Sequence, residues 1–549
     1  MRRMVVRVLM TGAGLAAASA GNAQQPEDHR HGPEAHGLGK LGQVTFPVSC
    51  TAEAGRRFER AMAVLHSFWW EEGDAAFNRV LEADSSCAMA YWGLALNAWG
   101  NPFAGGPTGD GATRGAEAAA RAASLPARTP RERGFIAAVA ALYRDPETTP
   151  NGVRLQAYAD TMARLYRHFH RDTEVATFYA LALDATAPKT DTTFAQQKRA
   201  AAILNPLFAR YPQHPGLAHY IIHSTDSPQL AHLGLTAARR YARIAPAAPH
   251  AQHMPSHIFV RLGYWDETIA SNLTASRAGV ANARAKGTPP PGEVLHALDY
   301  AVYAYLQEGR DSAARATVAM AQSLDVPAGK SPVGDYNRTA MAARIPLETG
   351  DWTAAARFPV APMQGVGTQA MLSRFTRAIG AARSGDRAAA RAEVAALDSI
   401  AVQMAEKKEP YWSRVAGIKR DAARAWVMFA EGDTAGGLAL AKAAADTEEV
   451  TDKHPVTPAE LLPARELEGD MLLEAGRYVE AGRTYRVTLA RERGRARSLF
   501  GVARASELDG NRIAAKAAYR QFLLHMSKGD GVRVELAKAK GFEGSAKRN

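Results

Sequence analysis

The sequence predicts an all-α protein, built as an α-solenoid of about ten helical hairpins. Alanine, leucine and arginine are abundant, apolar residues recur at helical spacing, and the alternation typical of strands is scarce. Glycines punctuate these helical stretches, and Gly476 and Gly510 stand 34 residues apart. A chain of 549 residues is also longer than one hydrophobic core normally serves, which agrees with a repeat array.

Composition excludes several classes of protein. A hydrophobic content of 47% with 22% charged residues argues against a disordered chain. Two cysteines are too few for a disulfide-dense scaffold or a four-cysteine zinc module. The net charge of +12 is spread along the chain rather than gathered in one tract, so no nucleic-acid partner is expected.

The first residues have the order of a secretory signal. Three arginines precede an apolar, alanine-rich stretch from Val8 to Ala20, and small residues follow as far as Ala23. We therefore expect residues 1–23 to be a signal peptide and the mature protein to be periplasmic or extracellular. The apolar stretch is too short and too interrupted by glycine for a membrane span, and no longer one follows.

The next stretch precedes the helices. Residues 24–48 are rich in histidine, glycine, proline and charge at their start, which predicts a flexible N-terminal segment. Cys50 and Cys87 follow, and two buried thiols are one interpretation of them. The oxidising compartment of an exported chain favours a structural disulfide instead. That bond would tie the segment before the first helix to the loop after the first helical hairpin.

The turns between helices give the repeat its register. Around Gly263, Gly476 and Gly510, a glycine follows one helix, an aromatic or polar residue comes after it, and a small residue stands nearby in the second helix. Further copies of this turn centre on Gly309, Gly350, Gly385 and Gly432. Some of the spacings exceed 34 residues, so we expect some helices or loops to be longer than the others.

These features resemble the tetratricopeptide repeat (TPR) family, in an exported bacterial form. Its unit is a helix, a turn and a second helix. The resemblance covers roughly residues 55–527; in the last unit Ala503 and Ala515 hold small positions, and Tyr519 and Phe522 hold large ones. It implies a curved solenoid in which first helices line a concave groove that binds partners.

The resemblance also divides the chain. Residues 49–170 are expected to form an N-terminal TPR-like helical region, in which the pattern is weakest. Residues 171–325 contain central repeats with a group of histidines. Residues 326–549 contain the C-terminal repeats, where the pattern is strongest.

The histidines of the central repeats carry the most specific signal. His219 and His223 are four residues apart, as are His253 and His257. In the repeat frame set by Gly263, the two pairs hold equivalent positions that face the groove in the TPR family. Residues four apart share one face of a helix, and neighbouring helices pack about 8–10 Å apart. The four imidazoles are therefore candidate ligands of a transition metal ion, zinc or copper.

Other polar residues are expected beside these histidines. The candidate ligand-binding residues are His250, His296, Asp299, Tyr303, Asp226 and Arg261. Asp299 could supply an oxygen ligand or orient a ring, and Asp226 could support His223 from one turn away. Arg261 could contact an anion.

Pro255 interrupts the helix that would carry the second histidine pair. Proline lacks an N–H group and clashes with the preceding turn of a helix. Either the helix begins near Pro255 and leaves His250 and His253 on its approach, or it is kinked there.

Several functions are compatible with this sequence. The favoured one is a protein-binding or assembly scaffold that holds a protein or peptide in its groove, with a metal or a polar ligand at the histidines. Open array ends also allow a homo-oligomer. The alternative is a metal-dependent enzyme of the hydrolase type, with Asp299 or Tyr303 assisting, although no motif places a general base. In a third interpretation the histidines only satisfy one another.

Overall fold

Every regular element in the described part of the chain is a helix. The computed structural model describes residues 38–107 and 109–545, so the expected signal peptide at 1–23 and most of segment 24–48 lie outside the described residues. The chain from Lys40 onward forms one unit, and the following description concerns that unit.

The helices run in this order: α1 (Ala52–His66), α2 (Trp70–Ala83), α3 (Ala88–Trp99), α4 (Asp110–Ser124), α5 (Pro130–Leu142), α6 (Asn151–His168), α7 (Thr173–Ala185), α8 (Ala195–Arg210), α9 (Pro215–Thr225), α10 (Ala231–Ile244), α11 (Pro249–His253), α12 (Pro255–Leu262), α13 (Trp265–Lys286), α14 (Gly292–Gln307), α15 (Asp311–Ser323), α16 (Pro332–Thr349), α17 (Trp352–Ala356), α18 (Thr368–Ser384), α19 (Arg387–Glu406), α20 (Pro410–Ala430), α21 (Thr434–Glu449), α22 (Ala464–Glu474), α23 (Tyr478–Arg491), α24 (Ala496–Leu508), α25 (Arg512–His525) and α26 (Val534–Ser545).

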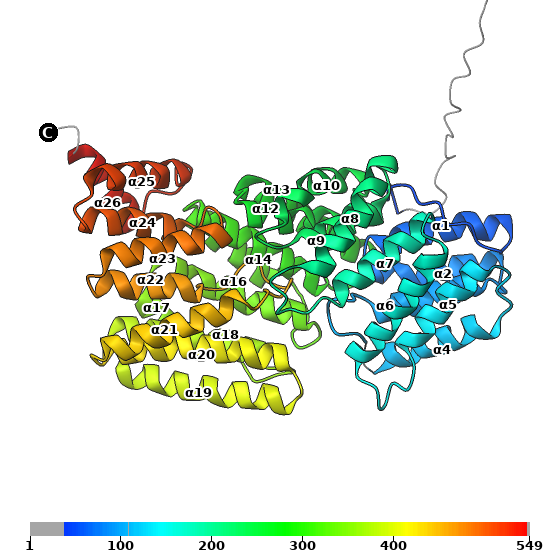
Figure 1. Cartoon of the computed structure of the whole chain (residues 1–549), viewed down its shortest axis with the longest axis horizontal. Coiled ribbons are helices and arrows are strands. Elements are labelled where there is room, and N and C mark those ends of the chain that lie inside the picture. Colours follow the sequence, from blue (N-terminus) through cyan, green and yellow to red (C-terminus); the bar gives the residue numbers. More distant parts are fainter. Residues whose placement is uncertain (1–37, 108, 546–549) are drawn as a thin grey trace, which may run out of the picture. The chain divides into compact units, whose positions relative to one another are not determined.

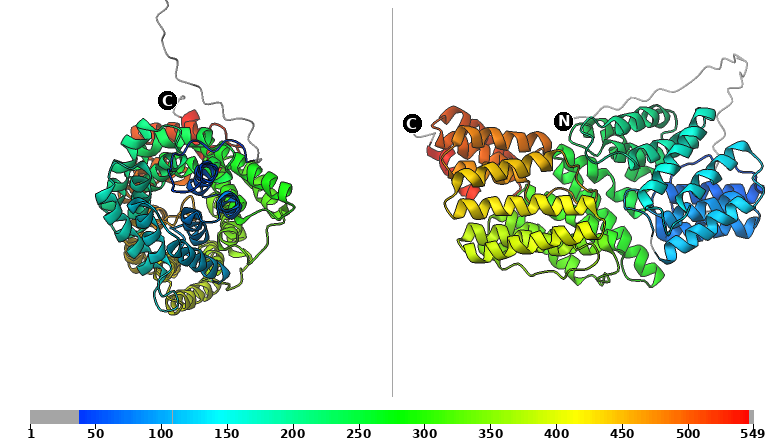
Figure 2. Two further views of the ribbon diagram at one scale, coloured as in Figure 1. Left: turned by 90° about the vertical axis from the view of Figure 1, so that its right-hand side faces the viewer. Right: turned by 60° about the horizontal axis from the view of Figure 1, so that its bottom comes forward.

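Consecutive helices pair into hairpins that stack in chain order (Figure 1). Helix α1 pairs with α2, α3 with α4, and so on to α24 with α25, while α11 and α12 together take the place of one first helix before α13. First helices of successive hairpins also pack on each other, as α14 does on α16 and α16 on α18. The colours in Figure 2 follow this progression from hairpin to hairpin. The predicted all-α solenoid of TPR-like hairpins is confirmed.

The turn glycines adopt the conformation that such a turn requires. All seven have a positive φ, between 68° at Gly309 and Gly350 and 99° at Gly432. Side chains rarely adopt this left-handed conformation, whereas glycine does so readily. The next residue then donates its N–H to a carbonyl five residues back, as Arg310 does to Tyr305 at 2.9 Å. Each such bond closes the end of the first helix and directs the chain into the second.

Aspartate or asparagine follows four of these glycines and starts the next helix. The side chains of Asp351, Asp386, Asp433 and Asn511 each accept a hydrogen bond from the backbone N–H three residues later. Such a cap satisfies one of the free N–H groups at a helix start. Glycine followed by Asp or Asn therefore predicts both the end of one helix and the start of the next.

Small and large residues share the space between hairpins as the repeat register predicts. Ala503, Ala515, Tyr519 and Phe522 are all buried, and they pack in one cluster at the C-terminal end of the array. Longer helices account for the wide spacing between some turns: α19 has 20 residues and α20 has 21.

The segment before α1 is more ordered than its composition predicts. Leu41, Val44 and Phe46 are buried, and Gln43 donates its N–H to the carbonyl of Gln213 at 2.9 Å. The expectation of a flexible segment up to residue 48 is therefore wrong for residues 40–48. Three apolar side chains in this stretch reach the core, although the histidine- and glycine-rich part before them hides that signal.

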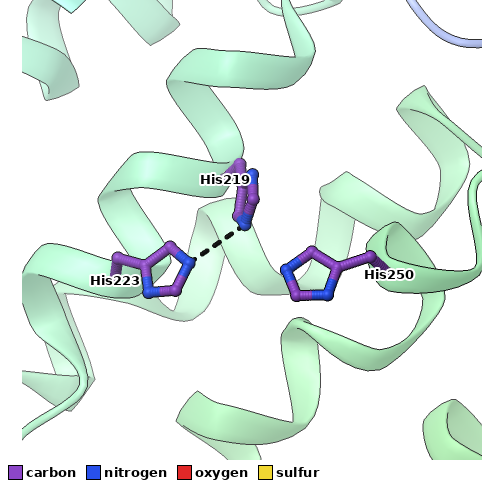
Figure 3. A group of neighbouring side chains, drawn as sticks. All are labelled: His219, His223 and His250. Atoms are coloured by element: carbon purple, nitrogen blue, oxygen red, sulfur yellow. Dashed lines mark hydrogen bonds between the residues drawn. The ribbon is translucent and has the colours of Figure 1, made fainter. Parts of the chain in front are cut away.

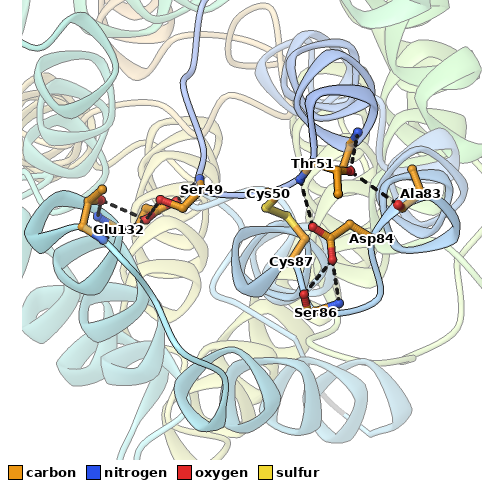
Figure 4. Close-up of a disulfide and its surroundings, with 10 residues drawn as sticks. Ser49, Cys50, Thr51, Ala83, Asp84, Ser86, Cys87 and Glu132 are labelled. Atoms are coloured by element: carbon orange, nitrogen blue, oxygen red, sulfur yellow. Dashed lines mark hydrogen bonds between the residues drawn. A yellow bond between two sulfur atoms is a disulfide. The ribbon is translucent and has the colours of Figure 1, made fainter.

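A disulfide joins this region to the second hairpin (Figure 4). Cys50 lies just before α1, and Cys87 is the N-cap of α3. Their Cα atoms are 5.3 Å apart. Nearby, Asp84 accepts a hydrogen bond from the N–H of Thr51 at 3.0 Å, which holds the same two segments together.

One long connection does not follow the stacking. Residues 450–463, here named the strap, join α21 to α22 without forming a helix. Arg344 of α16 donates to the Thr457 Oγ1 atom at 2.8 Å and to the Ala459 carbonyl at 3.0 Å. The strap therefore lies against first helices, on the side where the sequence predicts a groove for a partner peptide. At this place the strap, a segment of the same chain, occupies the predicted groove.

Among the helices that the structure describes, none combines the length and the apolar character needed to cross a membrane.

We predict opposite effects of alanine at two glycines that both have room for a methyl group. Gly510→Ala forces a side chain onto a φ of 79° and should lower the free energy of unfolding by about 1–2 kcal/mol. Gly417→Ala lies inside α20, contacts nothing closer than 3.9 Å, and should raise it by about 0.4–1 kcal/mol. Urea unfolding followed by circular dichroism measures both. A Gly417→Ala variant that is less stable than the wild type would contradict the prediction for this helical position.

Candidate metal centre

Six histidines from consecutive first helices gather into two groups of three. The first triad is His219, His223 and His250, and the second triad is His253, His257 and His296. Within each triad, one ligand atom from every residue lies within 4.8 Å of the others. Helix α9 supplies two ligands of the first triad, and α11, α12 and α14 supply one each of the second.

The break at Pro255 sets how the histidines are shared. Helix α11 ends at His253 and α12 begins at Pro255, while Met254 between them keeps helical angles of −53° and −36°. The first of the two predicted alternatives does not describe this geometry, because the backbone stays helical through Met254 and His250 and His253 are themselves helical. The histidines lie on one helical stretch that is interrupted at Pro255. His250 and His253 both lie on α11 but belong to different triads, so this one helix contributes a ligand to each.

In the second triad, ring nitrogens face one another directly. The Nε2 atoms of His253 and His257 are 3.0 Å apart. Two nitrogen ligands of a tetrahedral zinc ion, each about 2.0–2.1 Å from the metal, would be separated by roughly 3.4 Å. The observed separation is close to this value. His296 completes the triad, with its ring centroid 4.4 Å from that of His253.

The other nitrogen of each ring is bound to an acceptor. Nδ1 of His253 lies 2.6 Å from Asn272 Oδ1, and Nδ1 of His257 lies 2.9 Å from Asp226 Oδ2. Nδ1 of His296 lies 3.1 Å from the carbonyl oxygen of Val456 in the strap.

These oxygens accept hydrogen bonds, which favours the tautomer that carries the proton on Nδ1. Two weaker contacts compete for Nδ1, because the Tyr300 hydroxyl lies 3.4 Å from that atom of His257 and the Asn337 Nδ2 atom lies 3.4 Å from that atom of His296. A ring protonated on Nδ1 has a bare lone pair on Nε2, so the facing Nε2 atoms of His253 and His257 then have no donor between them.

Protonation of the three imidazoles of the second triad is unfavourable. Burial, and then the neighbouring imidazoles, hold the pKa of His253 and His296 well below the ordinary value. Burial also lowers the pKa of His257, although Asp226 opposes the change. Neutral rings whose lone pairs converge are the usual ligands of zinc and copper, and the acceptors on Nδ1 are what orients such ligands.

Each carboxylate next to the second triad is paired with cations. Asp226 accepts from His257, and its other oxygen accepts from Arg261 at 2.8 Å. Lys453 lies 3.4 Å from Asp226, and Arg261 lies 3.7 Å from Asp452. Lys189 lies 3.5 Å from Asp452 as well, so three cations accompany two carboxylates beside the imidazoles.

The first triad has a similar arrangement (Figure 3). The Nε2 atoms of His219 and His223 are 3.1 Å apart, and His219 donates through Nδ1 to the carbonyl of His66 at 2.7 Å. Nε2 of His250 is buried and has no hydrogen-bond partner. Figure 3 shows a ring nitrogen of His250 turned toward the other two rings. Burial, and then neighbouring imidazoles, lower the pKa of all three.

Two phenylalanines enclose the first triad. The ring of Phe68 lies 4.4 Å from that of His219 and stacks on His250 at 5.6 Å. Phe68 has a φ of 49°, in the left-handed region that a bulky residue seldom adopts, and such strain is held only where surrounding contacts fix it. Phe103 stacks on His223 with a centroid distance of 4.5 Å. Aromatic rings thus flank all three imidazoles, of which His223 and His250 remain half-buried.

A third group of candidate ligands has a different chemistry. Nε2 of His66 lies 2.9 Å from Glu174, and Nε2 of His214 lies 2.8 Å from the other oxygen of the same carboxylate. Burial would raise the pKa of Glu174, but the two histidines hold it well below its ordinary value. The remaining ring nitrogens bond to Tyr220 and to the N–H of Leu217. Every ligand atom is satisfied, so this group is a structural network.

The structure separates some predicted site residues from the histidines. Asp299 is fully buried, and its two oxygens accept from Arg344 at 2.7 and 3.2 Å. Tyr303 points instead toward Glu492, with its hydroxyl 3.3 Å from that carboxylate. The expectation that Asp299 and Tyr303 serve the histidines is therefore wrong. The buried Arg344 binds the Asp299 carboxylate instead, and the Tyr303 hydroxyl lies beside Glu492, which is remote in sequence.

Other predictions need refinement. Arg261 is engaged by Asp226 and Asp452, so its charge is already matched by carboxylates. The two histidine pairs do not close on one ion as a set of four. His250 joins the first pair and His296 joins the second.

Sequence reasoning missed several contributors to the site, including Asn272 and Phe103 described above. The Tyr300 ring lies 5.1 Å from the rings of His257 and His296, and its hydroxyl donates to strap carbonyls. It stands four residues after His296, so the rule that placed the histidine pairs could have found it. Phe68 and the strap residue Val456 come from remote parts of the chain and carry no local signal.

Comparisons with known proteins add little to this geometry. No family profile and no curated protein matches the chain. The crystal structure of yeast Tom70 is similar over 90% of this chain and 96% of that chain, with 9% identity and a TM-score of 0.27. A structure of Naa15/Naa10 bound to HypK-THB covers 90% of this chain and 75% of that chain, with 11% identity and a TM-score of 0.22. At such scores neither likeness bears on function.

We predict that the metal-free protein loses stability as the pH falls below about 6.5. The six clustered histidines have lowered pKa values in the folded state, so only the unfolded chain binds protons readily in this range. Stability is therefore complete above that pH and declines below it, by up to about 1.4 kcal/mol per pH unit for each histidine.

Urea unfolding in the presence of a chelator at pH 7.5 and about pH 5.5 measures this slope. The double variant His253→Gln, His296→Gln should show a shallower slope, whereas His232→Gln, an exposed residue of α10, should not. Equal slopes in the wild type and the double variant would refute the prediction.

Proposed function

We propose that this chain is an exported TPR-like protein that binds a transition metal ion, copper or zinc, through His253, His257 and His296. The observation that carries the proposal is the convergence of three buried imidazoles, each with Nδ1 beside an acceptor oxygen, in which the Nε2 atoms of His253 and His257 face each other at 3.0 Å. The tautomer that these acceptors favour leaves no N–H between the two facing nitrogens, and a metal ion would satisfy both lone pairs.

The ligand set narrows the choice of metal. Three neutral imidazoles suit copper and zinc, and copper binds nitrogen ligands more tightly than zinc in the usual affinity order. Both cysteines are in the disulfide, so thiolates do not compete for the metal. Calcium and magnesium prefer oxygen ligands, which the triad lacks.

Export is part of this proposal. It is supported by the signal-like order of residues 1–23 and by the disulfide, since disulfides persist mainly in oxidising compartments. A scaffold role for the rest of the array also remains a proposal. At the histidines the strap occupies the inner side, so a protein partner would bind the array elsewhere.

A metal-dependent enzyme is the second candidate. It is favoured by the first triad, because His223 lines a small cavity and three-histidine zinc sites with an open fourth position support hydrolysis.

We predict that protein purified without a histidine tag contains at least one copper or zinc ion per chain, or takes it up on incubation. His253→Gln combined with His296→Gln should lower the content by one ion, because it removes two of three ligands. Plasma mass spectrometry measures the content, and His232→Gln is the control. Metal-free wild type after incubation, or an unchanged double variant, would disprove the proposal. Bound metal should also raise the melting temperature of the wild type.

We predict that the mature protein begins at Gln24 when the full chain is expressed with a working secretion system. N-terminal sequencing of the exported fraction tests the cleavage site. A variant that lacks residues 2–23 should stay in the cytoplasm. If that variant is exported equally well, residues 1–23 are not the signal.

A further inference from the structure

The two triads are neighbours as well as similar. Across them, the ring centroids of His223 and His257 are 6.3 Å apart, and those of His250 and His253 are 6.0 Å apart. Helix α11 carries His250 toward one triad and His253 toward the other, so one short helix supplies a ligand to each triad.

The first triad has an observation of its own that points to a ligand. His219 carries its proton on Nδ1, because it donates to the His66 carbonyl, and this leaves Nε2 bare toward His223. The buried Nε2 of His250 has no partner. A buried polar atom without a partner is costly, and a metal ion bound by all three nitrogens would satisfy it.

We infer that the two triads form one dinuclear metal centre, in which the second triad holds an enclosed ion and the first triad holds an ion that binds a small anion. This inference rests on the proposed function, because it assumes that the second triad binds metal.

The two triads differ in how accessible they are to small ligands. The strap and Tyr300 cover the second triad through the bonds of Val456 to His296 and of Tyr300 to Pro455. The first triad instead borders a cavity of about 30 Å³, lined by His223, Phe103 and Asp184 among others. This space accommodates about two water molecules or one small anion, so exchange of ligands is expected on this side alone.

Asp184 lines this cavity and offers it a hydrogen-bond acceptor. Its side chain is 8% exposed, and the buried Oδ2 atom has no partner. A water or hydroxide on the first-triad ion could donate to this oxygen. Burial raises the pKa of Asp184 to about 7, while Lys189 opposes the change.

Charge balance favours an anion at the open ion. The six ligands are neutral imidazoles, and the adjacent Asp226 and Asp452 are matched by Arg261, Lys453 and Lys189. Asp184 adds at most one negative charge. Two divalent ions would therefore bring positive charge into a buried site with little compensation, which is unfavourable unless an anion binds with them.

Copper loading with electron paramagnetic resonance tests the inference. The wild type should bind two Cu(II) ions per chain, and the signal should be much weaker than that of two isolated ions, because the unpaired electrons of two neighbouring Cu(II) ions couple. His223→Gln should lower the content from two ions to one and restore the full signal of a single Cu(II). His232→Gln should match the wild type. If His223→Gln does not fold, as judged by circular dichroism, His250→Gln replaces it.

Azide tests the difference between the two halves. It should add a charge-transfer absorption band to the copper-loaded wild type and to His296→Gln, which retains the open ion. The band should be absent from His223→Gln. Azide binding that survives in His223→Gln and disappears in His296→Gln would reverse the assignment and refute it.

The outcomes separate the two proposals. One copper per chain in the wild type refutes the dinuclear centre and leaves the proposed function intact. Two ions with the full signal of isolated Cu(II) refute the coupling, and with it the shared centre. No copper and no zinc in any preparation refutes both.

Discussion

The direction of four of the six clustered imidazoles depends on the hydrogen bond that Nδ1 makes. In the second triad the acceptors come from Asn272 on α13, Asp226 after α9, and Val456 in the strap. In the first triad, the acceptor for His219 is the carbonyl of His66, at the end of α1. The lone pairs converge only when all these elements have docked, so the candidate centre is a product of the whole stack rather than of one hairpin.

Much of the fold follows from local rules. A glycine that ends one helix and an Asp or Asn that starts the next are short-range signals, and all seven predicted turns have the expected conformation. The shared core follows from small and large residues at matched repeat positions. Residues 40–48 were harder to predict, because three apolar side chains there are buried despite the glycine- and histidine-rich stretch before them.

The candidate site was predictable only in part. Repeat register places His219 with His223, and His253 with His257, because each pair depends on spacing within one helical stretch. The sorting into triads depends on the helix break at Pro255, which shifts His250 and His253 onto α11. Asp299 could not be assigned from register, since its partner Arg344 lies 45 residues away and competes for both oxygens. The contacts of the strap with His296 and Arg344 cross more than 100 residues and leave no periodic trace in the sequence.

The strap also changes what kind of array this is. Solenoids generally tolerate the gain or loss of whole units, because each unit touches only its neighbours. Here residues 450–463 reach back to α14 and α16, several hairpins earlier in the chain. Duplication or deletion of a unit between those helices and the strap would move Val456 out of register with His296. The number of hairpins in that interval is thereby fixed, and this part of the array cannot evolve by simple changes of length.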